Sequence, residues 1–235
     1  MTNPGLQSGV WQIISELTMK AIIVPFLALS EPHAGMSRIS NALDMLGPGN
    51  PIDVINWAGY DNRPLVKFNL AYGSSEIYIK YYVTEPYTKA EHTQSNDEVY
   101  EDSCVEFFVA PNAKGLYFNF EFNAIGTCLM AVGPDRNNRQ RMDPKVIAGI
   151  QRLASLGDQP FAEQKEGLSW ELTVAIPLKV FIGMDIKDLN GKTFRANFYK
   201  CGDKLTMPHY LSWNPIGTEK PDFHRPEYFG TIKFE

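Results

Sequence analysis

Cysteine is scarce in this sequence, with three residues among 235, at positions 104, 128 and 201. No two of them form a Cys-x-x-Cys pair or stand at the spacing of metal ligands, so a zinc ribbon is not expected. The odd number also argues against a disulfide scaffold. Cys104 falls within a strand-like run, where a small buried residue is the simplest interpretation. The sequence therefore predicts no metal site and no cofactor.

Long apolar runs and an excess of positive charge are also absent. No run is long enough to cross a membrane, so no membrane span is expected. The apolar segment 20–30 is interrupted by Pro25 and predicts a first strand in preference to a signal peptide, which favours a cytoplasmic over a secreted protein. Residues 1–18 are interpreted as an N-terminal extension, and Met1 and Met19 both remain open as the start. The net charge of −5 argues against general nucleic-acid binding.

Motifs of common catalytic sites are missing as well. The four histidines are dispersed along the chain. No Ser/His/Asp order, nucleophile elbow, phosphate-binding loop or His-Glu-x-x-His motif is found. The enzyme classes that these motifs mark are therefore not expected.

Two strand-like runs occupy the centre of the chain. In residues 102–110 and 116–124, polar and apolar side chains alternate with the period of two that is typical of a half-buried strand. The segment 111–115 between them predicts a hairpin turn. One face of this hairpin is aromatic and suits a core. The opposite face carries carboxylates and amides, and must meet water, a partner or a ligand.

Further strand patterns follow along the chain, whereas helical periodicity is brief. Short helices are expected at 36–46 and 145–156, with a helical turn at 178–181 and a loop at 87–96. The sequence predicts an all-β fold, in which residues 19–235 form a single antiparallel β-sandwich with two or three short peripheral helices. The other expected strands lie at 65–72, 76–84, 127–132, 168–176, 193–200, 209–213 and 228–234.

Acidic residues cluster around the predicted hairpin. Glu106 and Glu121 are expected to be neighbours across it, and a glycosidase requires two carboxylates that flank the bond to be cleaved. The alternative is an ion-paired strand face with Lys80, Arg195 or Lys200 as partners.

An oxygen-rich segment precedes the hairpin. It contains Asn96, Asp97, Glu101 and Asp102, and such oxygen ligands are typical of calcium sites. The segment lacks the ordered spacing of an EF-hand loop, so calcium is only an alternative to the expectation of no cofactor.

The C-terminal part combines aromatic, proline and charged residues. Trp213 suits either the core or a platform on which the C–H face of a sugar ring stacks. His224 and Arg225 are donors that suit hydroxyl or carboxylate groups. The alternative for Arg225 is an ion pair with Glu227 that ties down the last strand. Trp57 is the candidate for a second aromatic wall.

Taken together, these segments resemble the family 9-like carbohydrate-binding modules. The resemblance rests on residues 96–108 and 117–127, on the strand-like 195–199, and on 213–215 with 223–230, and it covers most of residues 52–235. It implies a jelly-roll-like β-sandwich related to DOMON domains, with non-catalytic binding of a mono- or oligosaccharide. Founding members of the family clamp a sugar between two tryptophans, and Trp213 is the better match to such a wall. The binding residues implied here are Trp213, Trp57, His224, Arg225, Glu106, Glu121 and Asn119.

Two other functions remain open at this point. One is a carbohydrate-active enzyme of the glycoside hydrolase type that uses Glu106 and Glu121. The other comes from the wider DOMON group and is a haem-binding domain with Met and His as axial ligands.

Overall fold

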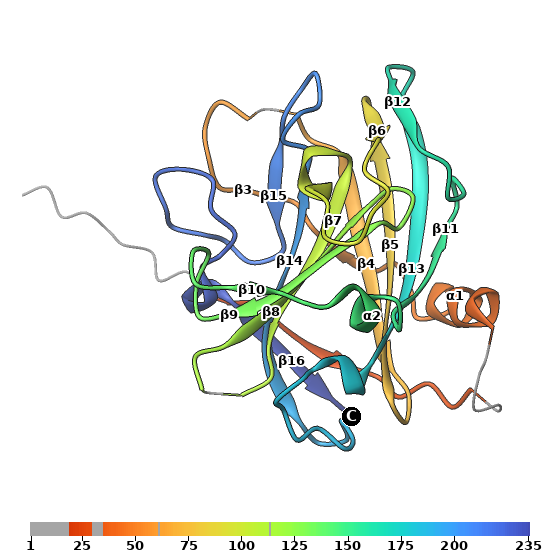
Figure 1. Cartoon of the computed structure of the whole chain (residues 1–235), viewed down its shortest axis with the longest axis vertical. Helices are drawn as coiled ribbons and strands as arrows, with labels where there is room; N and C mark the ends of the chain where they lie inside the picture. The colour runs from red at the N-terminus through yellow and green to blue at the C-terminus, as the bar shows by residue number, and fades with distance from the viewer. Residues whose placement is uncertain (1–18, 30–34, 61, 113) are drawn as a thin grey trace, which may run out of the picture.

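The computed structural model describes residues 19–29, 35–60, 62–112 and 114–235. Figure 1 shows two main β-sheets that face each other, and the largest hydrophobic cluster lies between them. The predicted all-β sandwich is thereby confirmed. The predicted N-terminal extension at 1–18 lies outside the described residues.

The larger sheet contains the central hairpin. Its strands are β1 (Ala21–Val24), β3 (Val54–Ile55), β7 (Cys104–Ala110), β8 (Tyr117–Asn123), β9 (Cys128–Gly133), β10 (Gln140–Arg141), β14 (Thr193–Cys201), β15 (Tyr210–Ser212) and β16 (Gly230–Phe234). The main path runs β1-β16-β14-β7-β8-β9-β10, with β15 beside β14 and β3 beside β15. β1 pairs with β16 in parallel, whereas β14, β7, β8 and β9 pair with one another in antiparallel fashion. The predicted first strand at 20–30 is thus confirmed as β1.

The smaller sheet covers the other side of the core. Its strands are β2 (Asn50–Pro51), β4 (Leu65–Tyr72), β5 (Glu76–Glu85), β11 (Gln151–Ala154) and β13 (Leu168–Pro177). They follow the order β11-β13-β5-β4-β2. A separate two-stranded ribbon pairs β6 (Thr88–Ala90) with β12 (Phe161–Gln164).

Helices are short and peripheral in the described chain, as predicted. The longest, α1 (Met36–Asp44), buries Ile39 and Leu43 against Ala71, Tyr78 and Ala175 on the outer side of the smaller sheet. The remaining helical segments are α2 (Pro144–Ile147), η1 (Val99–Glu101), η2 (Leu178–Val180) and η3 (Pro226–Tyr228). Within the described ranges, none of the helices combines the length and apolar character that a membrane crossing needs.

Two local predictions are wrong. The expected helix at 145–156 ends at Ile147, and residues 151–154 instead form β11, whose backbone groups pair with β13. Gly149 favours this ending because it lacks a side chain and has a low helix propensity. The expected loop at 87–96 contains β6, which pairs with β12. In both places a pairing partner distant in sequence decided the outcome.

The inner face of β7 and β8 is the aromatic face that the alternation predicted. Phe107, Phe118, Phe120 and Phe122 are all 0% exposed. Phe107 stacks on Phe198 of β14 with ring centroids 4.9 Å apart. Burial of such large apolar side chains is the main source of stability for a sandwich of this kind.

Candidate functional site

The outer face of β7, β8 and β14 carries polar side chains, because side chains alternate between the two faces of a strand. Glu106 lies directly opposite Glu121 across the hairpin, as predicted, and Cys104 lies opposite Cys201 across β7 and β14. The exposed fractions of Glu106 and Glu121 are 3% and 2%. The polar face is therefore buried, although it does not belong to the main core.

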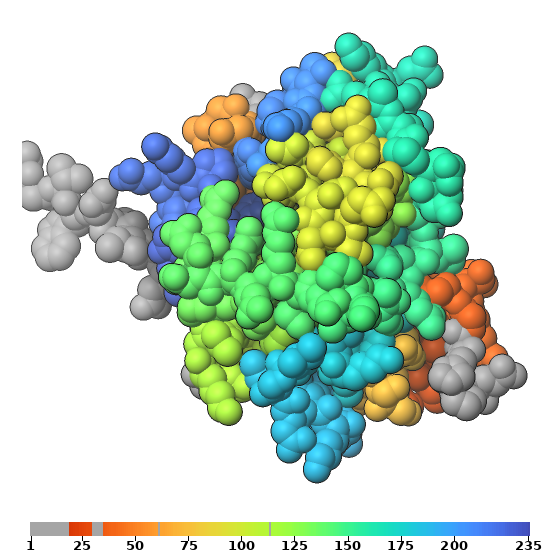
Figure 2. All heavy atoms as spheres, viewed as in Figure 1, coloured from red at the N-terminus to blue at the C-terminus, as the bar shows by residue number. Residues whose placement is uncertain are grey.

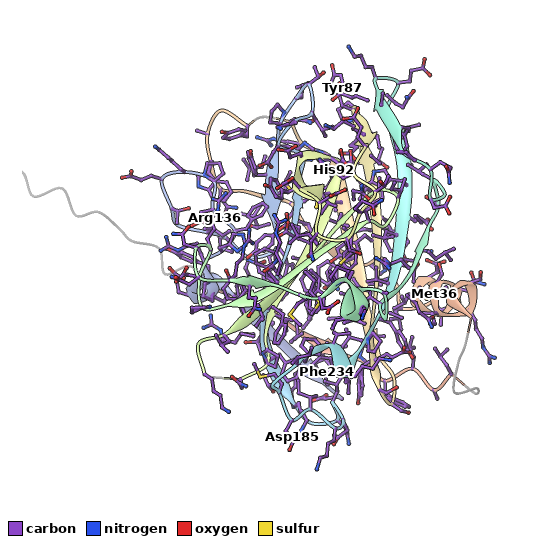
Figure 3. The ribbon with its side chains drawn as sticks, viewed as in Figure 1. Met36, Tyr87, His92, Arg136, Asp185 and Phe234 are labelled. Atoms are coloured by element: carbon purple, nitrogen blue, oxygen red, sulfur yellow. The ribbon has the colours of Figure 1, made fainter. Side chains whose placement is uncertain are left out.

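Loops and short segments cover this face. Figure 2 shows the chain from β6 to η1 in yellow and the loop between β9 and β10 in green at the front of the molecule. His92 and Arg136, labelled in Figure 3, belong to these two covering segments. A cavity of about 300 Å³ remains beneath the cover. It is lined by carboxylates and guanidinium groups of Glu106, Glu121, Asp203, Asp222, Arg136 and Arg139, and by rings of Tyr60, Tyr100, Tyr210, Phe223 and His224.

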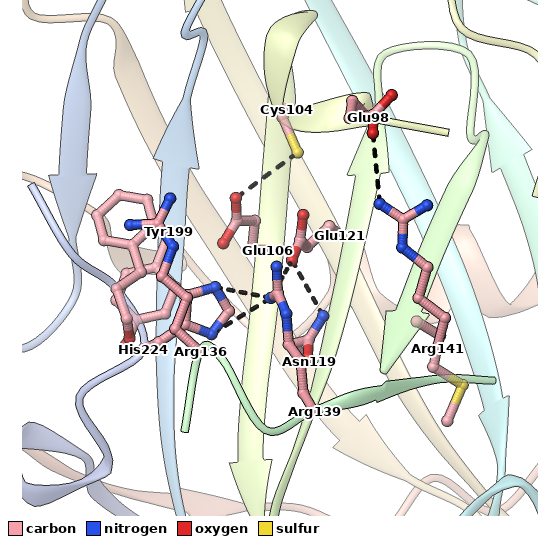
Figure 4. Close-up of polar contacts among 12 residues, drawn as sticks. Glu98, Cys104, Glu106, Asn119, Glu121, Arg136, Arg139, Arg141, Tyr199 and His224 are labelled. Carbon is pink, nitrogen blue, oxygen red and sulfur yellow. Dashed lines mark hydrogen bonds and ion pairs between the residues drawn. The ribbon is translucent and has the colours of Figure 1, made fainter. Parts of the chain in front are cut away.

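Arg139 links the two predicted parts of the site (Figure 4). Its Nη1 lies 3.5 Å from Oε1 of Glu121 and 2.7 Å from Nε2 of His224. Since a guanidinium can only donate, Nε2 of the imidazole accepts this hydrogen bond. Nδ1 of a neutral His224 then carries the proton and donates to the hydroxyl oxygen of Tyr117, 2.8 Å away. Asn119 Nδ2 also donates to Glu121 Oε1, at 3.0 Å.

Burial shifts the protonation of the groups around the cavity. Burial, opposed by the charge of Arg139, raises the pKa of Glu121 to about 7. Burial and then repulsion by Glu121 raise the pKa of Glu106 well above its ordinary value of 4.5. The pKa of Asp203 rises to about 6, again mainly through burial. The cavity floor therefore holds Glu121, which titrates near neutral pH, beside Glu106, whose protonated form burial favours.

The same burial keeps His224 neutral. Desolvation, followed by the charge of Arg139, lowers the pKa of His224 to about 2. Its ring lies 4.9 Å from that of Phe108. The ring is thus an uncharged acceptor for Arg139 at neutral pH, and it helps to fix the guanidinium beside the cavity.

One wall of the cavity is aromatic. Phe223 stacks on Tyr199 with ring centroids 4.2 Å apart and planes within 6°, and Tyr60 meets Tyr210 edge to face. Trp57 lies behind this wall, where it contacts Tyr210 and Phe223, and it is 4% exposed. Trp57 therefore supports the wall and does not itself line the cavity.

The structure contradicts the predicted stacking role of Trp213. This side chain is 1% exposed and belongs to the core between the sheets. Its ring meets those of Phe68 and Phe198 at nearly right angles. Of the two interpretations that the sequence allowed for Trp213, a core residue or a sugar platform, the structure supports the core residue.

Arg225 is also absent from the cavity. Its guanidinium forms an ion pair with Glu227 near the surface. This is the alternative that the sequence left open for Arg225. Its neighbour in the chain, His224, points into the cavity instead.

The ion-paired alternative for the acidic face holds for Glu121, but with a different partner. Lys80 pairs with Asp44 and Glu171, and Lys200 pairs with Glu85. Arg195 donates to backbone carbonyls of the C-terminal segment. None of the three expected cations lines the cavity. Lys80 belongs to the smaller sheet, Lys200 alternates with Tyr199 and Cys201 and so lies on the other face of β14, and Arg195 lies at the opposite end of that strand from Cys201.

The oxygen-rich segment before the hairpin uses its carboxylates within the protein. Asp97 accepts the backbone N–H groups of Thr93 and Gln94, and Glu101 pairs with Lys204. Asp102 Oδ2 accepts backbone N–H groups and the amide of Asn123. These contacts give the segment a structural role, and the expectation of no cofactor, with calcium as its alternative, stays a prediction.

Residues that sequence reasoning missed contribute much of the cavity. Arg136 and Arg139 belong to a polar loop that directly follows β9. Two cations therefore come soon after the acidic hairpin in the sequence. Asp203 and Tyr210 flank the turn between β14 and β15. All four residues lie at or near the end of a strand of the polar face. This position could have indicated them only if the order of the strands in the sheet had been known.

Comparison with known proteins supports the same fold and places the chain beside carbohydrate-binding proteins. A family model described as carbohydrate-binding family 9 matches residues 44–234. None of the curated proteins matches the chain at a significant level.

Two solved structures share the fold. A candidate carbohydrate-binding protein from Bacteroides uniformis ATCC 8492 is 39% identical, with a TM-score of 0.89 over 93% of this chain and 100% of that one. A family 9 carbohydrate-binding module from Caldicellulosiruptor kristjanssonii, solved with cellotriose, is 15% identical. Its TM-score is 0.54 over 92% of this chain and 94% of that one.

Proposed function

The chain belongs to carbohydrate-binding family 9, and we propose that the cavity on the outer face of the larger sheet binds a carbohydrate without chemical turnover. The observation that carries this proposal is the combination of buried carboxyls, a fixed guanidinium and an aromatic wall around one cavity. Sugars present hydroxyls that both donate and accept, together with C–H faces that pack on aromatic rings. Each of these features meets a complementary group in this cavity.

The size and chemistry of the cavity indicate what part of a carbohydrate it takes. A volume of about 300 Å³ lies at the small end of the range for ligand pockets. We therefore expect it to enclose a monosaccharide unit or the end of a short oligosaccharide. Glu121 and Arg139 offer charge-assisted hydrogen bonds to the hydroxyls, and Tyr210 and Phe223 offer the apolar surface. The carbohydrate solved with the Caldicellulosiruptor module makes cellotriose the first ligand to test.

Isothermal titration calorimetry tests the proposal. Cellotriose and a panel of mono- and oligosaccharides are titrated into the wild-type protein and into Tyr210→Ala, which shortens the aromatic wall. The exposed ring of Phe26, which is distant from this cavity, supplies the matched control Phe26→Ala. We expect wild type and the control to bind alike, and Tyr210→Ala to bind about tenfold more weakly. The proposal would be contradicted if the folded wild-type protein bound no sugar of the panel, or if both variants bound with equal affinity.

A second candidate function rests on the facing carboxyls. Glu106 and Glu121 lie directly opposite each other, and burial gives them unequal pKa shifts. Pairs of carboxyls whose pKa values are pushed apart are typical of acid–base catalysis on glycosidic bonds. If the site hydrolyses a glycoside, Glu121→Gln should end turnover of an aryl glycoside while a bound sugar is still detected by calorimetry. If the wild-type protein turned over no aryl glycoside of a panel, this second candidate function would be rejected and carbohydrate binding without catalysis would be retained.

A further inference from the structure

Two cysteines and a glutamate that are far apart in sequence meet at the floor of the cavity. Cys104 and Glu106 lie on the same face of β7, and strand pairing places Cys201 of β14 directly opposite Cys104. The Sγ atoms of these cysteines and one carboxylate oxygen of Glu106 all lie within 4.8 Å of one another. This is the one such group of three potential ligands among the residues that the structure describes.

We propose that Cys104, Glu106 and Cys201 form a binding site for a thiophilic divalent cation such as Zn²⁺. The distances to Oε1 of Glu106 are 3.1 Å from Sγ of Cys201 and 3.9 Å from Sγ of Cys104. Zinc bound tetrahedrally at its usual distances to sulfur and oxygen would separate these atoms by about 3.5 Å. The donor atoms thus already stand near the corners of one face of a tetrahedron.

The cavity supplies the remaining coordination position. Glu106 and Cys201 line it, whereas Cys104 is outside the lining and directs its thiol at Glu106 (Figure 4). A site with three protein ligands and one position open to a cavity is the arrangement that leaves room for water or a ligand oxygen. The cation would sit at the floor, below the ring-lined wall.

The surroundings of Glu106 favour a cation. Glu106 is 3% exposed, yet within the described residues no basic side chain forms an ion pair with it. Its side-chain hydrogen bonds come from the two thiols, which are weak donors. An ionised carboxylate left in this position would be costly without a positive partner. A divalent cation bound by both sulfur atoms would replace the thiol protons and provide that positive partner.

The balance of charge and protons is simple. Binding removes the proton from each thiol and any proton that Glu106 carries, and these protons pass to solvent. Two thiolates and one carboxylate then surround a doubly charged ion, which leaves one net negative charge. Arg139 and Lys200 act on these groups at longer range with the opposite sign. Thiolate ligands select zinc-like cations over calcium and magnesium, which prefer oxygen.

Strand pairing explains why spacing along the chain predicted no metal site. No two of the cysteines are close in sequence, and Glu106 and Cys201 are separated by 95 positions. Cys128 is buried in the main core on the inner side of the sheet and takes no part. It therefore offers a matched control within the same protein.

Cobalt spectroscopy and zinc calorimetry test the site with metal alone as the probe. The full-length protein is treated with a chelator, exchanged into buffer with a non-thiol reductant, and titrated with Co²⁺ and with Zn²⁺. We expect one equivalent to bind, with intense thiolate-to-cobalt absorption that Cys104→Ser and Cys201→Ser abolish. Cys128→Ala should retain it, and Ca²⁺ should give no binding heat at this site. Folding of every variant is checked by circular dichroism.

Glu106→Gln keeps the test decisive if the serine variants fold poorly. It preserves side-chain volume, and loss of this ligand should weaken Zn²⁺ binding beyond the roughly 10–100-fold that changes around a metal ligand cause. Absence of thiolate absorption in the wild type, or absorption unchanged in folded Cys201→Ser, would overturn the proposal. A disulfide between Cys104 and Cys201 that survives the reductant, seen as a single titratable thiol after unfolding, would also overturn it. Because no sugar is present, failure here is separate from failure of carbohydrate binding.

Discussion

On the inner side of β7 and β8, aromatic rings such as Phe107 and Phe120 pack against the second sheet. On the outer side, Glu106, Asn119 and Glu121 are just as deeply buried, but beneath loops. The inner face is held by non-directional apolar packing. The outer face is held by directed contacts, such as the chain Asn119–Glu121–Arg139–His224–Tyr117. One face therefore serves stability, and the other, which retains a cavity, is suited to recognition.

The largest effect should come from breaking the inner face at Trp213. Trp213→Ala removes a fully buried ring that meets Phe68 and Phe198, and large-to-small changes of this kind cost about 3–5 kcal/mol. We expect the free energy of unfolding, measured by urea denaturation, to fall by that amount. Leu65→Ala, at a side chain that is 75% exposed, is the control and should change it by less than about 0.5 kcal/mol. A stable Trp213→Ala protein that only loses sugar binding would return this residue to the site.

The second prediction concerns the outer face and pH. The pKa of Glu121 is raised from 4.5 to about 7, so the folded state holds a proton that the unfolded state loses. The contribution of Glu121 to stability is therefore present below pH 4.5 and is lost as pH rises through 7. The loss is on the order of 3 kcal/mol across that window. His224, whose pKa is lowered, has the opposite slope below its ordinary pKa of 6.5.

The comparison of wild type with Glu121→Gln separates these opposed slopes. Both proteins keep His224, so the difference between their unfolding free energies reports the titration of Glu121 together with its repulsion of Glu106. We expect this difference to shift in favour of the variant as pH rises from 4.5 to 7. Urea denaturation with a chelator present measures it, with the exposed Glu219→Gln as the control. A difference that does not change with pH would mean that Glu121 ionises as freely as it does in an unfolded chain.

Sequence reasoning succeeded where the period of two was the deciding signal. It gave the hairpin, its turn and the two faces, because alternation of Phe118, Phe120 and Phe122 with Asn119 and Glu121 has only one arrangement on a strand. It also placed Glu106 opposite Glu121. These features depend on local geometry, which a sequence of this length expresses directly.

The predictions were wrong or incomplete where a strand or loop distant in sequence decides the surroundings of a residue. Trp213 was expected at a sugar, but Phe198 of β14 and Phe68 of the facing sheet pack against it. Arg139 was not singled out, since nothing local shows that its loop folds back over β8. The cysteines were judged by spacing along the chain, whereas strand order brings Cys104 to Cys201. In each case the missing information was the neighbour across a sheet, and alternation alone does not supply that.

A smaller effect should follow when the outer face loses its cation. Arg139→Gln removes the charge that sits between Glu121 and His224, and we expect carbohydrate affinity to fall about tenfold, or roughly 1.4 kcal/mol. Arg141 lies two residues further on and instead contacts Asn96 and Glu98. Arg141→Gln is therefore the control and should bind as wild type does. Equal affinity of both variants, measured by calorimetry, would show that Arg139 only shapes the empty cavity.

The smallest effect should come from Arg225, which was predicted as a ligand-binding residue and lies outside both faces. Its guanidinium donates to Glu227 near the surface, where solvent screens the pair and side-chain entropy opposes it. Exposed pairs of this kind contribute less than about 1 kcal/mol. Arg225→Ala should therefore leave carbohydrate affinity unchanged and lower the unfolding free energy only slightly, and less still at high salt, because salt screens the attraction. A fall in affinity comparable to that of Arg139→Gln would mean that the binding surface extends from the cavity to the C-terminal segment. Recognition would then not be confined to the outer face of β7, β8 and β14.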